Sequence, residues 1–176
     1  RRPRRSLTLF VMRTNMTDAS RPAKNTLRAP VPPPVLFFVL LLLGVAVAHF
    51  RPLTFLPEGL TVQLLSALSF FALAVAIGVW AFSTFRRCRT SAEFGEPVST
   101  LVQQGPYRFS RNPLYVALIL VLAGFACALN NAWLAIVVPA LSVALDRLVV
   151  AREERFLSDL LGPDYLSYRA RGRRWC

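Results

Sequence analysis

The residues of this chain best suited to chemistry fall into two polar clusters separated by apolar sequence. The first, at 105–115, reads GPYRFSRNPLY and combines two arginines with two tyrosines. The second is the run Arg152-Glu153-Glu154, which contains a pair of carboxylates. Guanidinium groups match carboxylate or phosphate ligands, carboxylates accept hydrogen bonds from ammonium or hydroxyl groups, and tyrosine rings cover a flat ring. The two clusters therefore predict a site for a zwitterionic ligand that carries an aromatic ring.

The first cluster also carries the signature of a helix start. Asn112 occupies an expected N-cap position and Pro113 the first helical position. The N-terminus of a helix favours anionic ligand groups, and Arg108 and Arg111 add to that preference. The residue types alone leave a simpler alternative open, in which the motif only caps a helix and an Arg–Glu ion pair joins neighbouring helix ends. The sequence shows no metal-ligand cluster or glycine-rich phosphate loop, so no metal site is predicted.

Four apolar runs must position these clusters, and they lie at 35–50, 60–82, 113–129 and 133–150. A helix needs about 20 predominantly apolar residues to cross a bilayer, and a water-soluble domain of this size would not carry four such runs. The pattern predicts an all-α integral membrane protein. We expect four transmembrane helices in two hairpins, with a cytoplasmic loop between the hairpins and a C-terminal interfacial helix.

The chain is expected to divide into three parts. Residues 1–30 are basic and lack periodicity, which predicts a disordered segment. Residues 31–82 form the first transmembrane hairpin, and 83–176 form a region with the loop, the second hairpin and the C-terminal tail. A cleaved signal peptide is the alternative interpretation of the first run, because the Ala-Val-Ala at 46–48 resembles a cleavage site.

The distribution of basic residues predicts the orientation. Of the 21 Lys and Arg residues, eight precede the first apolar run, five lie in the loop between the second and third runs, and seven follow residue 145. By the positive-inside rule, both termini and the central loop are expected to be cytoplasmic. The net charge of +12 then reflects topology and attraction to anionic lipid. No nucleic-acid recognition motif accompanies it, so membrane lipids rather than nucleic acid are the expected partners.

The C-terminal tail has a pattern of its own. Apolar residues recur at helical spacing from 156 to 161, and Gly162-Pro163 should end that helix. The following residues, 165–175, interleave tyrosines and a tryptophan with arginines. This composition suits a segment that rests against lipid headgroups, and equally one that helps to close the ligand site.

Two stretches resemble a known superfamily. LVQQGPYRFSRNPLY, a helical hairpin, and then EERFLSDLLGPDYLSYRARGRRW together resemble the isoprenylcysteine carboxyl methyltransferase and phospholipid methyltransferase superfamily, in its bacterial branch, over about residues 83–175. The resemblance implies S-adenosyl-L-methionine as the methyl donor, bound at the cytoplasmic face. Carried over by position, it implies cofactor contacts at Ser99, Thr100, Leu101, Val102, Tyr107, Asn112, Pro113, Leu114, Tyr115 and Glu153. Arg111, Arg152 and Glu154 are the candidate substrate-binding residues, and no catalytic residue is assigned.

Two departures from the family pattern bear on the substrate. Eukaryotic members have histidine where this chain has Asn112, although asparagine is frequent in the bacterial branch. Their substrate-carboxylate arginine corresponds here to Val149. By helical phase Arg147 points to the opposite side, and Arg152 could replace that arginine only in part. These departures weaken the case for a prenylcysteine carboxylate as the acceptor.

The sequence therefore predicts a membrane-embedded S-adenosylmethionine-dependent methyltransferase. Its acceptor would be a lipophilic or small molecule that arrives from the bilayer, and a lipid amine, a thiol and a carboxylate all remain candidates. One alternative is an NADPH-dependent membrane reductase, which predicts nicotinamide nucleotide binding. The other is a non-catalytic membrane protein that retains the fold and binds no cofactor.

Overall fold

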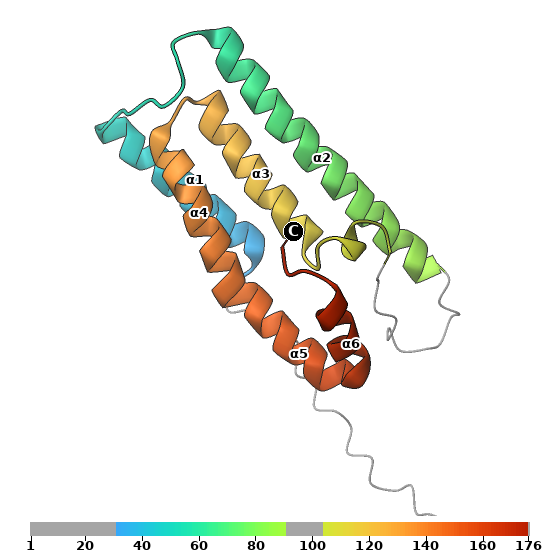
Figure 1. The fold of residues 1–176 in the computed structure, drawn as a ribbon. Coiled ribbons are helices and arrows are strands. Elements are labelled where there is room, and N and C mark those ends of the chain that lie inside the picture. The colour runs from blue at the N-terminus through green and yellow to red at the C-terminus, as the bar shows by residue number, and fades with distance from the viewer. Residues whose placement is uncertain (1–30, 91–103, 176) are drawn as a thin grey trace, which may run out of the picture.

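The structure, a computed structural model, describes residues 31–90 and 104–175 (Figure 1). The expected disordered segment 1–30 lies outside these residues, as do the expected cofactor contacts Ser99, Thr100, Leu101 and Val102. The described residues are helical, which confirms the all-α prediction. In chain order the elements are α1 (Pro33–Phe50), α2 (Leu60–Thr90), the 3₁₀ turn η1 (Gly105–Arg108), α3 (Pro113–Ala128), α4 (Ala132–Ala144), the π-helical turn η2 (Leu145–Val150), α5 (Ala151–Leu161) and α6 (Pro163–Arg171).

Within residues 31–90 and 104–175, three helical segments are long and apolar enough to cross a membrane: Pro33–Phe50, Leu60–Arg87 and Ala132–Asp159. The fourth expected span, Pro113–Ala128, is apolar but shorter, with 16 residues. Large apolar side chains on these helices point outward, and Leu42 and Leu65 are 66% and 62% exposed. A soluble monomer rarely exposes so wide an apolar surface. The chain is an integral membrane protein.

Two helical segments continue beyond the apolar runs that predicted them. α2 continues to Thr90 rather than ending with the apolar run at 82, and α4, η2 and α5 follow one another without a break past 150. In α2 the Thr84 hydroxyl donates to the Trp80 carbonyl at 2.8 Å, and the Arg86 guanidinium lies 5.6 Å from the Phe82 ring centroid. The helix therefore continues for about two turns after the apolar run ends at residue 82. Apolar content alone does not show where its last turn lies.

The helices do not pack in the order in which they follow one another. α2 lies along α3, α4 packs on the other flank of α3, and α1 packs against α4 (Figure 1). The main contacts of the two helices in the expected first hairpin are thus with the second hairpin. Two glycines permit this arrangement, since a Cβ at Gly44 would overlap the Leu134 side chain and a Cβ at Gly124 would overlap the Phe71 ring. Close approach at small residues is how membrane helices associate without a hydrophobic driving force.

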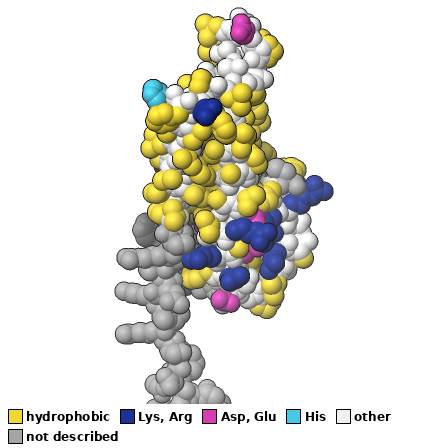
Figure 2. All heavy atoms as spheres, turned by 90° about the vertical axis from the view of Figure 1, so that its left-hand side faces the viewer, with side chains coloured by type: hydrophobic (Ala, Val, Ile, Leu, Met, Phe, Trp, Pro, Cys, Tyr) yellow, Lys and Arg dark blue, Asp and Glu magenta, His cyan; other side chains and the backbone are white. Residues whose placement is uncertain are grey.

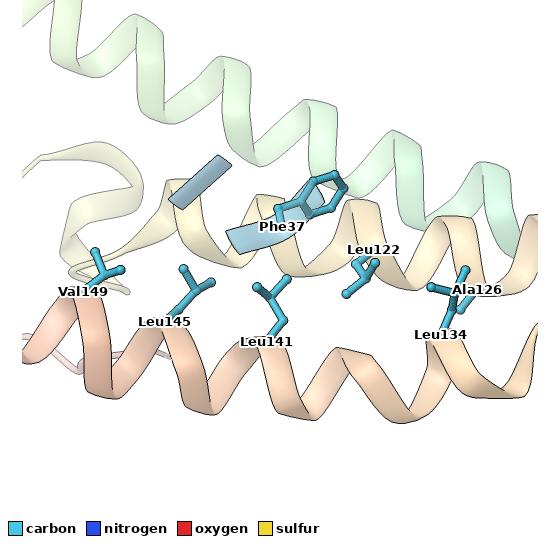
Figure 3. Packing of buried hydrophobic residues seen from close by; sticks show 7 residues of the cluster. All are labelled: Phe37, Leu122, Ala126, Leu134, Leu141, Leu145 and Val149. Carbon is cyan, nitrogen blue, oxygen red and sulfur yellow. The ribbon is translucent and has the colours of Figure 1, made fainter. Parts of the chain in front are cut away.

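The interior is a single column of aliphatic side chains along α4 and η2 (Figure 3). Leu134, Leu141 and Leu145 are completely buried, and Leu122 of α3 lies at a level between Leu134 and Leu141 (Figure 3). Basic side chains gather mainly at one end of the apolar surface (Figure 2). That end carries η1, the start of α3, α5 and α6 (Figure 1), so the two polar clusters of the sequence lie together beyond the apolar column.

At the opposite end of the molecule, the turn between α3 and α4 does more than connect the two helices. Asn130 has a φ of 42°, and its side-chain oxygen accepts from the backbone N–H groups of Phe55 at 3.1 Å and Leu56 at 2.8 Å. The neighbouring Asn131 caps α4 and also donates to the Gly44 carbonyl at 3.4 Å. Two asparagines thus join the α3–α4 turn to the segment that connects α1 and α2.

Replacing Asn130 by glycine is expected to lower the free energy of unfolding by about 1–3 kcal/mol. Glycine accepts the positive φ, so the loss isolates the hydrogen bonds to residues 55 and 56. Thermal unfolding of the detergent-solubilised protein measures the change. Leu129→Gly is the control, because it adds a glycine to the same turn and removes no side-chain hydrogen bond. Equal losses in the two variants would contradict the assignment.

Candidate functional site

A pocket of about 180 Å³ opens where η1, the start of α3 and α5 meet. Its walls consist largely of residues that the sequence had singled out. The lining residues are Tyr107, Arg111, Asn112, Pro113, Leu114, Tyr115 and Glu153. Tertiary structure therefore brings together every described residue of the expected cofactor set, together with one of the three substrate candidates.

The η1 turn packs closely against the end of α2, and a glycine makes this approach possible. Gly105 has a φ of 60°, and a Cβ there would lie 2.6 Å from the Thr84 hydroxyl oxygen and 3.2 Å from the Trp80 indole nitrogen. Glycine alone satisfies both the backbone conformation and the close approach. Pro106 then accepts from the backbone N–H groups of the two residues that follow the turn. This anchoring determines where Tyr107 and Arg111 stand at the pocket.

Helix α3 begins at Pro113 as expected, but the Asn112 side chain does not cap it. Its amide nitrogen instead donates to the Arg174 carbonyl at 3.0 Å, because the C-terminal segment offers a competing acceptor. The start of this helix also offers an anionic ligand fewer free backbone N–H groups than expected. Pro113 has no N–H, and the Tyr115 N–H donates to the Asn112 carbonyl at 3.0 Å, so in the first turn of α3 only Leu114 presents an N–H towards the pocket.

The centre of the pocket is a pair of side chains from two helices. The Tyr115 hydroxyl of α3 donates to Glu153 Oε1 of α5 at 2.8 Å. Both residues are half-buried, and the second carboxylate oxygen of Glu153 has no partner among the described residues. The pair therefore offers a ligand one oriented aromatic ring and one free carboxylate oxygen.

The neighbouring carboxylate has a different environment. Glu154 is buried and forms ion pairs with two arginines. Arg111 Nη1 lies 2.9 Å from its Oε1, and Arg174 donates hydrogen bonds through Nε at 3.1 Å and through Nη2. Asp146 completes the cluster at 3.2 Å from Arg174 Nη1. Successive residues on a helix point in different directions. Glu153 therefore lines the pocket, whereas Glu154 points into the ion-pair cluster. The Arg–Glu ion pair left open by the sequence is thus present at Glu154.

The arginines of this cluster are held in place on several sides. The Arg111 side chain is only 10% exposed, and neither its Nε nor its Nη1 has a hydrogen-bond acceptor among the described residues. Hydrogen bonding to Glu154 raises the pKa of Arg174 above its ordinary value, so that guanidinium stays charged. By contrast Arg152, a candidate substrate ligand, is exposed and does not line the pocket.

The C-terminal segment closes one side of the site. Arg173 pairs with Ser110 in an isolated parallel β-bridge, and its carbonyl accepts from the Arg111 N–H at 3.0 Å. Tyr168 of α6 donates to the Tyr107 carbonyl at 2.9 Å, and burial raises the pKa of Tyr168 to about 12, which keeps the phenol protonated as a donor. Of the two roles considered for the tail, contact with the site is the one observed.

Sequence reasoning considered Tyr168, Arg174 and Trp175 only as part of a tail that could help to close the site, and it missed Asp146. Asp146 carried a usable signal, because an acidic residue within an apolar run is costly and usually has a partner. Two nearby residues have different environments. Val149 is buried in the core at 1% exposure, and the Arg147 side chain is 80% exposed on the opposite side of the helix.

Comparisons with known proteins give one family and one relative. A family model described as phospholipid methyltransferase matches residues 62–164, which include both polar clusters. A protein of Haemophilus influenzae described as uncharacterized is 33% identical over 64 residues, which cover 35% of this chain and 98% of that protein. No solved structure matches.

Proposed function

Because the chain belongs to the phospholipid methyltransferase family, we propose that it is a membrane-embedded methyltransferase that uses S-adenosyl-L-methionine as its methyl donor. The observation that carries the proposal is the Tyr115–Glu153 pair in the pocket at the start of α3. The proposed cofactor contacts are those implied by the resemblance, with Tyr107, Asn112, Pro113, Leu114, Tyr115 and Glu153 in the pocket and residues 99–102 outside the described part of the chain.

The chemistry of the pocket fits this cofactor. S-adenosylmethionine carries an ammonium and a sulfonium charge, hydroxyl groups, a carboxylate and an aromatic base. The free oxygen of Glu153 accepts from an ammonium or hydroxyl group, and the rings of Tyr107 and Tyr115 attract cations and cover flat rings. Arg111, with its unpartnered buried Nε, is the matching group for the carboxylate. The pocket is smaller than the roughly 300–1,000 Å³ of typical ligand sites, and the contacts expected from residues 99–102 would add to it.

When bound, the cofactor supplies a methyl group that an acceptor can take in an in-line displacement. The residues of this chain then act by holding the reactants at the correct distance and angle, and such positioning can contribute up to roughly 7–11 kcal/mol. Half-buried side chains around the pocket also exclude water from the reacting groups. This role needs no general base among the lining residues, and we assign no catalytic residue.

We propose four spans, with both termini and the pocket on the cytoplasmic side, in a bacterial inner membrane. Helix α3 has 16 residues, which span about 24 Å at 1.5 Å per residue and require a thin bilayer or little tilt. The acceptor, a lipophilic or small molecule, would arrive from the bilayer. Buried Val149 stands where the carboxylate-binding arginine of relatives would be, which favours an acceptor without a carboxylate, such as a lipid amine.

Calorimetric titration of the detergent-solubilised protein with S-adenosylmethionine tests the cofactor, and NADPH is titrated in parallel. Micromolar binding of S-adenosylmethionine with none of NADPH is the expected result. NADPH binding alone would favour the reductase, and absent binding of both would favour a non-catalytic protein. Label transfer from methyl-labelled cofactor to phosphatidylethanolamine vesicles, a lipophilic thiol or a prenylcysteine then identifies the acceptor class.

A further inference from the structure

The C-terminal segment is held against the pocket by an acidic residue that does not itself reach the pocket. Asp146 lies in η2, and its carboxylate accepts from Arg174 Nη1 at 3.2 and 3.3 Å and from the Trp175 indole N–H at 3.0 Å. Trp175 also packs against the buried aliphatic core. A single carboxylate thus fixes two successive side chains of the tail.

One of these two residues, Arg174, also contacts a pocket residue through its backbone. The Arg174 carbonyl accepts from the Asn112 amide nitrogen at 3.0 Å, and Asn112 lines the pocket. An asparagine side chain has one donor end and one acceptor end. With the donor end bound to the tail, the side-chain oxygen Oδ1 is left as the free end, and no described residue donates to it. The carbonyl of Arg174 therefore determines which end of the amide is available to a ligand.

From these contacts we propose that Asp146 is a positioning residue, which holds Arg174 and Trp175 so that Asn112 presents its oxygen to a hydrogen-bond donor of the bound cofactor. The inference rests on the proposed function. It adds that the pocket prefers a hydrogen-bond donor of the ligand at the position of the Asn112 side-chain oxygen. An ammonium, amino or hydroxyl group is the partner for Asn112, in the same way as for the free oxygen of Glu153. Arg174 and Trp175 lie outside the residues that the family model matches, 62–164.

The alternative is that Asp146 serves only the stability of the fold. Arg174 pairs with Glu154 as well as with Asp146, so the loss of one carboxylate leaves the guanidinium with the other. The tail is therefore expected to remain folded without Asp146, but with Arg174 free to shift towards Glu154. A shift of the backbone at Arg174 would release the Asn112 amide. The two explanations differ in whether the effect of Asp146 passes through Asn112.

A double-mutant cycle on S-adenosylmethionine affinity distinguishes them. Asp146→Asn is expected to weaken binding about tenfold, the size of one lost hydrogen bond to a charged group. In an Asn112→Ala background, which has no amide to orient, the same substitution is expected to have almost no further effect, because the two residues act through one contact. Asp159→Asn is the matched control, since it makes the same chemical change at an exposed aspartate that does not line the pocket, and it should leave affinity unchanged.

The outcomes separate this inference from the proposed function. Wild-type protein that does not bind S-adenosylmethionine overturns both. Wild-type binding with an undiminished effect of Asp146→Asn in the Asn112→Ala background, or with no effect at all, overturns the positioning role alone. If Asp146→Asn does not fold, Trp175→Phe replaces it in the cycle, since that variant keeps an aromatic six-membered ring and removes the five-membered ring with the N–H donated to Asp146.

Discussion

Glu153→Gln is expected to weaken the binding of S-adenosylmethionine by at least about tenfold, while the unfolding temperature changes little. Glutamine keeps the shape of the side chain and can still accept from the Tyr115 hydroxyl. What disappears is the negative charge that faces the pocket, and with it the attraction for a cationic ligand. Calorimetric titration of the two proteins measures the difference, and circular dichroism confirms that the fold is retained.

Asp159→Asn is the control for this substitution. Asp159 is exposed on the same helix, α5, and does not line the pocket, so its neutralisation changes the net charge equally. Tyr115→Phe tests the other half of the pair, because it removes only the hydrogen bond that orients the carboxylate. Equal affinities of Glu153→Gln and Asp159→Asn would show that the pocket charge does not contribute, and would remove the main support for the proposed function.

Glu154→Gln, unlike Glu153→Gln, is expected to act mainly on stability. We expect it to lower the free energy of unfolding by about 3 kcal/mol. Its carboxylate is the partner of Arg111, whose side chain is only 10% exposed. Removal of one partner leaves the other charge buried without compensation, which costs more than the ion pair contributes. Thermal unfolding in detergent measures the loss, and Glu153→Gln provides the matched comparison because the chemical change is identical one residue away.

A compensating substitution tests the cause of that loss. Adding Arg111→Met to Glu154→Gln removes the uncompensated guanidinium and leaves Arg174 paired with Asp146. The double variant should regain part of the lost stability. If it is less stable than Glu154→Gln, the buried charge of Arg111 is not the reason for the loss. An unfolding temperature of Glu154→Gln equal to that of Glu153→Gln would likewise contradict the division of roles between the two glutamates.

Local sequence was sufficient for the helices and for the central residues of the pocket. The apolar runs placed the membrane helices because the free energy of inserting a segment depends mainly on its own composition. The Asn112-Pro113 step placed the start of α3 because proline is tolerated in the first turn of a helix. The motif also identified Tyr115 and Glu153, which the fold joins by a hydrogen bond. The helix ends at 90 and past 150 were not predictable, because neighbouring contacts and not apolar content decide where the last turn lies.

By itself, then, the sequence determined an all-helical membrane protein and the residue types of its pocket, because composition and short motifs act over one or two turns. Tertiary structure alone decided that α1 packs on α4, that Glu153 faces the pocket while Glu154 binds two arginines, and that Asp146 holds the tail beside Asn112. These contacts join residues far apart in the chain. Their free energies depend on burial and on the geometry of each partner, which no local pattern specifies.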